Sequence, residues 1–106
     1  SEKIRLKLSP ESLRAFNQIW EVSLPRSSKP LEQMVFLIVE QLSTKFLQRS
    51  IGLKKDTTLS LEKYEAIALK AYMQWCMTRL DNLANCGSYE LNEINKQYLV
   101  LDQKTI

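Results

Sequence analysis

The sequence predicts a mainly α-helical fold, a compact bundle of about four helices with one short β-strand at the N-terminus. Four segments repeat apolar residues at the three- and four-residue spacing of a helix, and Pro, Gly and Ser residues separate these segments. Residues 4–8 instead alternate between apolar and basic side chains, which is typical of a strand with one buried face. The 106 residues are 44% hydrophobic and 25% charged, as in an ordered globular domain. We therefore expect a single domain over residues 1–106, with residues 52–58 as the place where it could divide.

The first strand leads directly into a first helix, which we predict from about Pro10 to Val22. Ser9 suits the N-cap position, and proline is favoured at the first helical position. Glu11 complements the positive end of the helix dipole. The apolar stripe of this helix consists of Leu13, Phe16, Ile19 and Trp20.

A second helix follows a loop that is rich in proline and serine, and it should run from near Pro30 to about Ser50. Gly52 is well placed to end it. From Met34 to Val39 the helix is apolar on every side. Such a helix is buried all round, either at the centre of a bundle or partly against another subunit.

Residues 52–58 interrupt the helical pattern, and a third helix is predicted from about Leu61, with Ser60 as a candidate cap and Ala84 as its furthest reach. Residues 57–61 also allow a second interpretation, in which they form a short strand that pairs with residues 3–8. The first strand would then be paired inside one chain instead of between two subunits.

Gly87 and Ser88 form the next helix stop and cap, so a fourth helix is predicted from about Tyr89 to Asp102. Residues 98–101 fit this helix by their spacing and fit a terminal strand by their composition. We favour the helix.

A faint internal similarity accompanies the two candidate strands. Leu6-x-Leu8 and Leu59-x-Leu61 both precede a helix and lie 53 residues apart, and Ala15 matches Ala68 at the same spacing. The remaining identities are few. We interpret the similarity as coincidence in preference to an ancient duplication.

The charge distribution is uneven along the chain, whose net charge is +3. Residues 1–53 contain eight Lys or Arg and five Asp or Glu, whereas residues 54–106 contain seven of each. The positive excess therefore lies in the half that holds the first strand. It permits an acidic partner without requiring one, because nucleic-acid-binding domains are usually more basic.

The residue inventory argues against catalysis. The chain has no histidine, which is the commonest general base near neutral pH and the commonest metal ligand. Its two glycines do not cluster into a phosphate-binding loop, and two cysteines without histidine do not make a standard zinc site. Two carboxylate pairs, Glu62 with Glu65 and Glu90 with Glu93, lie in first helical turns, where they complement the dipole. We therefore expect a protein that is not an enzyme, with no catalytic or metal-binding residue, no cofactor and no small-molecule substrate.

The chain also shows no feature of a membrane or secreted protein. The apolar run from Met34 to Val39 is far shorter than the ~20 residues of a membrane span. A signal-peptide pattern is absent. Cys76 and Cys86 are interpreted as reduced thiols of the core. We expect a cytoplasmic protein without a membrane partner.

Aromatic residues gather in the third helix, at a spacing that suits either the core or an interface. Tyr64, Tyr72 and Trp75 are the candidate protein-interface residues, with Met73 and Met77 beside them. Their exposure in the folded protein would indicate a surface that binds a second copy or another protein.

Residues 3–49 resemble the ribbon-helix-helix family of DNA-binding domains. The matching stretches are IRLKLSPES as a strand and helix entry, PRSSKP as a turn, and LEQMVFLIVEQL as a second helix. The resemblance implies a dimer in which two strands pair into an antiparallel ribbon that enters the major groove of DNA. It implies that Arg5 and Lys7 face the bases with Lys3 at the edge, and that backbone N–H groups near Ser27 and Ser28 hold a phosphate.

Two functions therefore remain open. The first is a non-catalytic helical interaction protein that self-associates, as a homo-oligomer, or binds a protein partner through an apolar helix face. The second is a small DNA-binding accessory or regulatory protein that uses the N-terminal ribbon. We prefer the first from sequence, because the charge excess is small and residues 54–106 have no role in the second.

Overall fold

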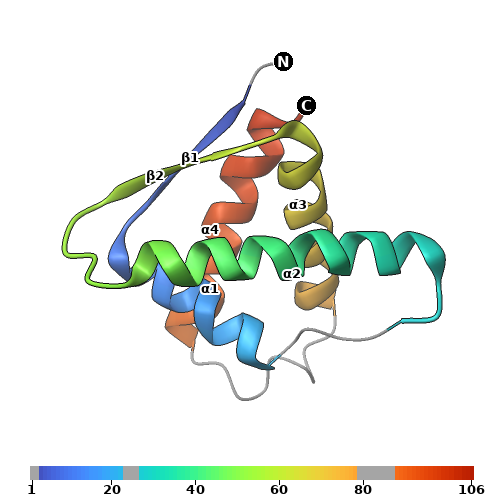
Figure 1. Cartoon of the computed structure of the whole chain (residues 1–106), viewed down its shortest axis with the longest axis horizontal. Helices are drawn as coiled ribbons and strands as arrows, with labels where there is room; N and C mark the ends of the chain where they lie inside the picture. Colours follow the sequence, from blue (N-terminus) through green and yellow to red (C-terminus); the bar gives the residue numbers. More distant parts are fainter. Residues whose placement is uncertain (1–2, 23–26, 79–87) are drawn as a thin grey trace.

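The computed structural model describes residues 3–22, 27–78 and 88–106, and these residues form a mainly helical fold with a small antiparallel sheet (Figure 1). The predicted fold class is confirmed. In chain order the elements are β1 (Ile4–Leu8), α1 (Pro10–Val22), α2 (Pro30–Ser50), β2 (Thr57–Leu61), α3 (Lys63–Thr78) and α4 (Ser88–Lys104). Within the described residues, no helix combines the length and the apolar character that crossing a membrane requires.

The ends of the first two helices follow the local signals in the sequence. The backbone N–H of Ser12 donates to the hydroxyl of Ser9 at 3.1 Å, which is the N-cap bond that the sequence predicts. Helix α2 begins at Pro30 and ends at Ser50. Gly52 follows with a φ of +68°, a left-handed conformation that glycine adopts without steric cost. Both helices therefore have the predicted bounds.

The third and fourth helices differ in detail from the prediction. Ser60 lies in β2 and does not cap α3, because the strand interpretation of residues 57–61 is the one that the structure adopts. Glu65 takes over the capping role, and its carboxylate accepts a bond from the backbone N–H of Glu62 at 2.8 Å. Residues 98–101 are helical, as favoured. The predicted extension of the third helix to Ala84, together with Cys86 and Gly87, falls outside the described residues.

Strands β1 and β2 pair antiparallel within the chain, and this pairing answers the question that the sequence left open. Leu6 lies opposite Leu59 at the centre of the register, and Ile4 lies opposite Leu61 at one end. Leucine side chains from both strands are buried on one face of the sheet. A complete two-stranded ribbon therefore exists without a second subunit.

The structure consists of two halves with the same element order, strand-helix-helix. Positions 53 residues apart are buried alike in the strand and first helix of each half, and both strands show the same burial pattern. The pairs of equivalent buried positions are Leu6 and Leu59, Leu8 and Leu61, Leu13 and Ala66, Ala15 and Ala68, Phe16 and Leu69, Ile19 and Tyr72, and Trp20 and Met73. The 53-residue spacing, which the sequence alone leaves as a coincidence, thus separates structurally equivalent positions.

The packing of the helices repeats in the same way. Helix α1 packs on α2 and α3 packs on α4 within the halves, whereas α2 packs on α3 and α1 packs on α4 between them. Exchanging the two halves leaves this set of contacts unchanged. Together with the register centred on Leu6 and Leu59, it indicates an approximate two-fold relation between the halves.

One hydrophobic core joins all six elements. Its aromatic centre lies where α1, α2 and α3 meet. The rings of Trp20 and Phe46 are 5.5 Å apart in an edge-on arrangement, and Trp20 is also 5.5 Å from Tyr72. The Trp20 ring therefore joins α1 to both α2 and α3.

Candidate functional site

The outward side of the β1–β2 sheet forms a polar surface, which we call the ribbon face and define as Arg5, Lys7, Thr58 and Ser60. Alternation along each strand places these side chains opposite the buried leucines. In the register Arg5 faces Ser60 and Lys7 faces Thr58, so each cation has a small hydroxyl residue across from it. Arg5 and Lys7, which the family resemblance implies as base-facing residues, thus lie exposed on the same face of a two-stranded ribbon.

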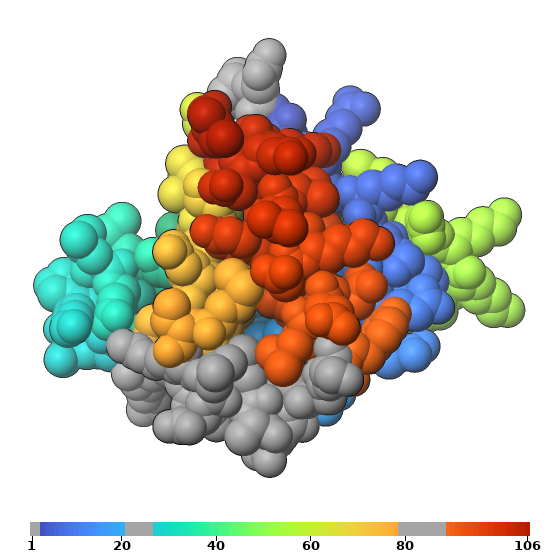
Figure 2. Space-filling model, turned by 180° about the vertical axis from the view of Figure 1, so that it is seen from behind, coloured from blue at the N-terminus to red at the C-terminus, as the bar shows by residue number. Residues whose placement is uncertain are grey.

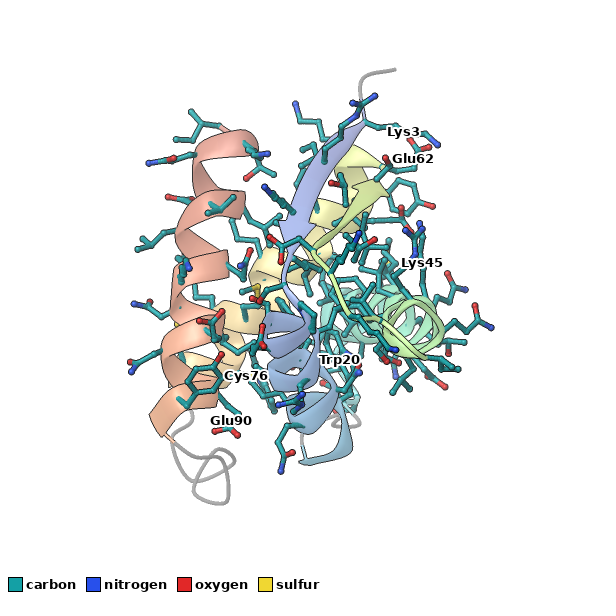
Figure 3. The ribbon with its side chains drawn as sticks, turned by 90° about the vertical axis from the view of Figure 1, so that its left-hand side faces the viewer. Lys3, Trp20, Lys45, Glu62, Cys76 and Glu90 are labelled. Carbon is teal, nitrogen blue, oxygen red and sulfur yellow. The ribbon has the colours of Figure 1, made fainter. Side chains whose placement is uncertain are left out.

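A lysine from a neighbouring helix lies at each side of the sheet. Helix α4 flanks β1, and the ammonium of Lys104 donates to the carbonyl oxygen of Arg5 at 2.6 Å. Helix α2 flanks β2, and the ammonium of Lys45 donates to the carbonyl oxygen of Ser60 at 3.2 Å (Figure 3). These lysines discourage the addition of another strand and place two more cations beside the ribbon face.

Two hollows along β1 each have several cations in their lining. One is bordered by Lys7, Lys96 and Lys104, with Asp56 as the acidic member. The other is bordered by Lys3, Arg5, Lys63 and Lys104. Figure 2 shows α4 between α3 and the β1–α1 segment, and Lys96 and Lys104 of α4 border the same hollow as Lys7 of β1. This arrangement suits an extended polyanion that passes over the ribbon.

Lys3 extends the basic surface at the open end of the ribbon, at the edge position that the resemblance implies. Its ammonium lies 3.6 Å from a carboxylate oxygen of Glu62, and Figure 3 shows the two side chains together. This exposed ion pair partly neutralises Lys3.

Ser27 and Ser28 are not brought to the ribbon. They precede the N-terminus of α2, whereas β2 follows the C-terminus of the same 21-residue helix, which is about 30 Å long. The hydroxyl of Ser27 donates to Glu32 at 2.8 Å and accepts the backbone N–H of Lys29 at 3.1 Å. The Ser27 hydroxyl is therefore already bonded to a carboxylate at the start of α2.

A second surface is apolar, and it lies where the N-terminal part of α2 passes α3. We define the α2–α3 face by its exposed side chains, and Figure 2 shows that this part of α2 projects beyond the body of the molecule. The exposed fractions are 79% for Leu31, 59% for Met34, 61% for Leu37, 60% for Tyr64 and 45% for Ile67. Isolated exposed apolar residues are ordinary, whereas these five form a contiguous apolar group.

A shallow groove runs through the α2–α3 face. Met34 and Ile38 border it from α2, and Tyr64 and Ile67 border it from α3. Ala71 lies in the groove, where a larger residue would fill the space between the helices. The groove is therefore open to an apolar side chain from outside.

The three predicted interface residues have different environments. Tyr64 is exposed and belongs to the α2–α3 face. Tyr72 is 1% exposed and lies in the aromatic centre, so it does not contribute to a surface. Trp75 is half-buried, with its ring 5.5 Å from that of Phe36. Of these three residues, Tyr64 is the one available to a partner.

A polar contact also joins the two halves near the start of α4. The hydroxyl of Ser12, a buried residue of α1, donates to the carboxylate of Glu93 at 2.7 Å. Next to it, the pKa of Tyr89 is raised by partial desolvation of the phenol and then by the negative charges of Glu93 and Glu11. This cluster fixes α4 against α1, and a raised pKa keeps the phenol neutral.

Sequence reasoning missed several residues of both surfaces. Thr58 and Ser60 lie on the ribbon face because residues 57–61 form a strand. Their alternation with Leu59 in the sequence could have predicted this. Lys45 and Lys104 had no such signal, because their position depends on how the helices pack. The continuous apolar run of α2 likewise did not indicate which of its sides is exposed.

Comparisons with known proteins add no relationship. No protein-family model matches this chain, and no curated protein or solved structure is similar enough to it to count as a match. Groups of three or more potential metal ligands from His, Cys, Asp and Glu are absent among residues 3–22, 27–78 and 88–106. The two surfaces described above are therefore the basis for a functional proposal.

Proposed function

We propose that this protein is a small DNA-binding protein whose ribbon face enters the major groove as a single-chain reader. The observation that carries the proposal is the antiparallel pairing of β1 with β2, which presents Arg5 and Lys7 outward on one two-stranded ribbon. The second half of the chain then has a role, because it supplies the second strand. This removes the main reason for preferring an interaction protein from sequence.

The dimensions and chemistry of the ribbon support this proposal. The major groove of DNA admits a two-stranded β-ribbon, and outward side chains can then reach the base edges. Arginine and lysine donate to guanine O6 and N7, whereas serine and threonine hydroxyls bond either donors or acceptors. The ribbon face carries one residue of each of these four types.

The cations around the ribbon support backbone contact on the β1 side. Lys96 and Lys104 of α4 lie along one border of the hollow next to β1, and Lys7 lies along the other. Phosphate contacts of this kind position a protein on the duplex, while contacts from the ribbon face select sequence. We therefore place the DNA backbone over the β1–α4 side.

The test is binding to fluorescein-labelled duplexes, first selected from a random-sequence pool with the parent protein. We expect the double variant Arg5→Ala/Lys7→Ala to bind the selected duplex at least about 100-fold more weakly, because two base-edge contacts of about 1–3 kcal/mol each are lost. The matched control is Arg14→Ala/Lys29→Ala, which removes the same charge from exposed positions outside the ribbon. It should bind within about threefold of the parent.

Equal binding by the two double variants would contradict the proposal, because affinity would then depend on net charge alone. Circular dichroism of both variants controls for folding. Since all four substituted side chains are exposed, we expect unchanged helix content.

The α2–α3 face supports a second function, in which the protein also acts as a non-catalytic interaction protein. Five large apolar side chains stand exposed there together, away from the ribbon. The apolar dye anilinonaphthalenesulfonate should fluoresce with the dilute monomer and lose this signal with Met34→Glu. If the dye signal is the same in both, the face is not an accessible apolar surface.

A further inference from the structure

We infer that the α2–α3 face binds a second copy of this chain, with the two α2 helices packed antiparallel across a two-fold axis near Met34. This inference rests on the interaction function proposed for this face, and it is independent of the ribbon face. Three properties of the face lead to it: its area, its shape and the charges at its ends.

The area of the face matches one half of a small specific interface. The exposed parts of its five large side chains amount to roughly 600 Å², which is the upper range for the largest apolar patch on a monomer. A two-fold dimer would cover such a patch on both copies and bury about 1,200 Å², the lower limit of stable specific interfaces. The face is thus large enough for a reversible dimer.

The shape of the face is complementary to itself. The groove between α2 and α3 lies beside an exposed ridge, because Leu37 and Met34 project from the outer side of α2. A two-fold axis places the ridge of each copy against the groove of the other. A face with only a ridge, or only a groove, would require a different partner.

The charges at the ends of the exposed segment select the antiparallel orientation. Lys29 precedes the segment and Glu40 follows it, and both side chains are exposed. In an antiparallel pair centred near Met34, Glu40 of each copy lies next to Lys29 of the other. In a parallel pair, like charges would face each other, which is unfavourable.

The first test is the mass of the protein by light scattering after size exclusion, over a wide range of concentrations. We expect the parent to pass from 12.4 kDa to twice this mass as its concentration rises. Met34→Glu should raise the dimer dissociation constant at least about tenfold, because the dimer would bury a carboxylate in an apolar contact. Gln48→Glu makes the same charge change at an exposed position of α2 outside the face, and it should dimerise like the parent.

The second test examines the two-fold packing itself. With Cys86 replaced by serine, Met34→Cys should form a disulfide-linked dimer under mild oxidation, whereas Gln48→Cys should not. Lys29→Glu and Glu40→Lys should each weaken the dimer about two- to fivefold, and the two changes together should restore it.

These outcomes distinguish a failure of the second-copy inference from a failure of the interaction function on which it rests. A parent that remains monomeric overturns the second-copy inference but leaves the face available to another protein. A dimer that Met34→Glu does not weaken, or that Met34→Cys does not cross-link, overturns the packing proposed here. DNA binding by Met34→Glu is measured in parallel, so a failure of the ribbon proposal is seen independently.

Discussion

The two halves of this protein are alike inside and different outside. In β1 and β2 the leucines of each half occupy equivalent buried positions and meet at the centre of the sheet. The outward residues differ, since β1 carries Arg5 and Lys7 where β2 carries Thr58 and Ser60. Burial therefore constrains the residue type at the repeated positions, whereas the exposed positions differ between the halves.

The second helices of the halves show the same contrast. Buried positions of α2 and α4 correspond at a spacing of 55 residues, as for Val39 with Ile94 and Phe46 with Leu101. The exposed side of α2 is apolar near its N-terminus, whereas the exposed side of α4 mixes Tyr89 and Leu99 with Asn, Lys and Gln residues. The α2–α3 face combines the apolar side of α2, from the first half, with Tyr64 and Ile67 of α3, from the second half.

The largest expected effect concerns the shared interior. Leu6→Ala and Leu59→Ala should each lower the free energy of unfolding by about 2–5 kcal/mol, because both side chains are fully buried and each leaves a cavity. Their costs should agree within about 1 kcal/mol if the positions are equivalent. Urea denaturation followed by circular dichroism measures both.

Because the two leucines touch across the sheet, the double variant should cost less than the sum of the single costs. A large difference between the two single variants would break the comparison between the halves. Additive costs would show that the two cavities do not merge.

The next prediction concerns basic residues added to β2, the strand of the second half. Thr58→Arg/Ser60→Lys should steepen the dependence of log affinity for duplex DNA on log salt concentration by about two, because up to two further phosphates would be neutralised. Both side chains are exposed on the outward face of the strand. The free energy of unfolding should therefore change by less than about 0.5 kcal/mol.

Fluorescence anisotropy at several salt concentrations gives this slope. The control variant is Lys54→Arg/Lys55→Arg, at exposed positions outside the ribbon face. It leaves the net charge unchanged, and its salt dependence should equal that of the parent. An unchanged slope in the Thr58/Ser60 variant would mean that the β2 side of the ribbon does not approach DNA.

A smaller effect is expected where the interiors of the halves differ. Gln97 in α4 corresponds to Leu42 in α2, and it is 5% exposed with no partner for its carbonyl oxygen among the described residues. Gln97→Leu should raise the free energy of unfolding by about 1 kcal/mol, because an unsatisfied buried acceptor is replaced by an apolar group. Asn95→Leu, at an exposed position of the same helix, should not stabilise the protein. A loss of stability in Gln97→Leu would instead reveal a polar role for this site.

The smallest effect concerns Tyr89, whose counterpart in α2 at the 55-residue spacing is Met34. Replacing Glu93 with glutamine should lower the raised pKa of Tyr89 toward its ordinary value, because one of the carboxylates that disfavour the phenolate is removed. Alkaline difference titration of absorbance near 295 nm measures this pKa, with Tyr89→Phe to identify the contribution of Tyr89.

The sign of the stability effect follows from the raised pKa. The folded state holds the phenol proton more tightly than the unfolded state does, so the contribution of Tyr89 is complete below the unfolded pKa. It is lost as the pH rises through the folded pKa. A pKa of Tyr89 that Glu93→Gln leaves unchanged would exclude Glu93 as a cause and leave desolvation with the other nearby carboxylates.

Much of the fold could be predicted because it depends on residues that are close together along the chain. Ser9, Pro10 and Gly52 set the ends of helices through interactions within a few residues of each other, and the structure has those ends. Ser60 was misassigned as a cap because the alternation of residues 57–61 and a helix-start signal overlap there. Pairing with β1 decides between these two signals, and it is a contact between distant residues.

The sequence predicted some residues of the two candidate surfaces and missed others. Alternation places Arg5 and Lys7 on one face of a strand, and the resemblance to the ribbon-helix-helix family implies that they face the bases. Tyr72 was assigned to an interface because its helix has apolar residues on several sides, and hydrophobicity does not state which side meets the core. Leu31 and Leu37 were missed for the same reason.

Local patterns in the chain were enough to predict the class of fold, most helix ends, and which side of the first strand is polar. These properties depend on backbone geometry and on side chains that are near neighbours along the chain. Three properties depend instead on long-range contacts: the ribbon pairs within one chain, Lys45 and Lys104 flank it, and part of α2 stays uncovered. Each of these depends on contacts between the two halves, in which burial of the shared core determines which surfaces remain exposed to solvent.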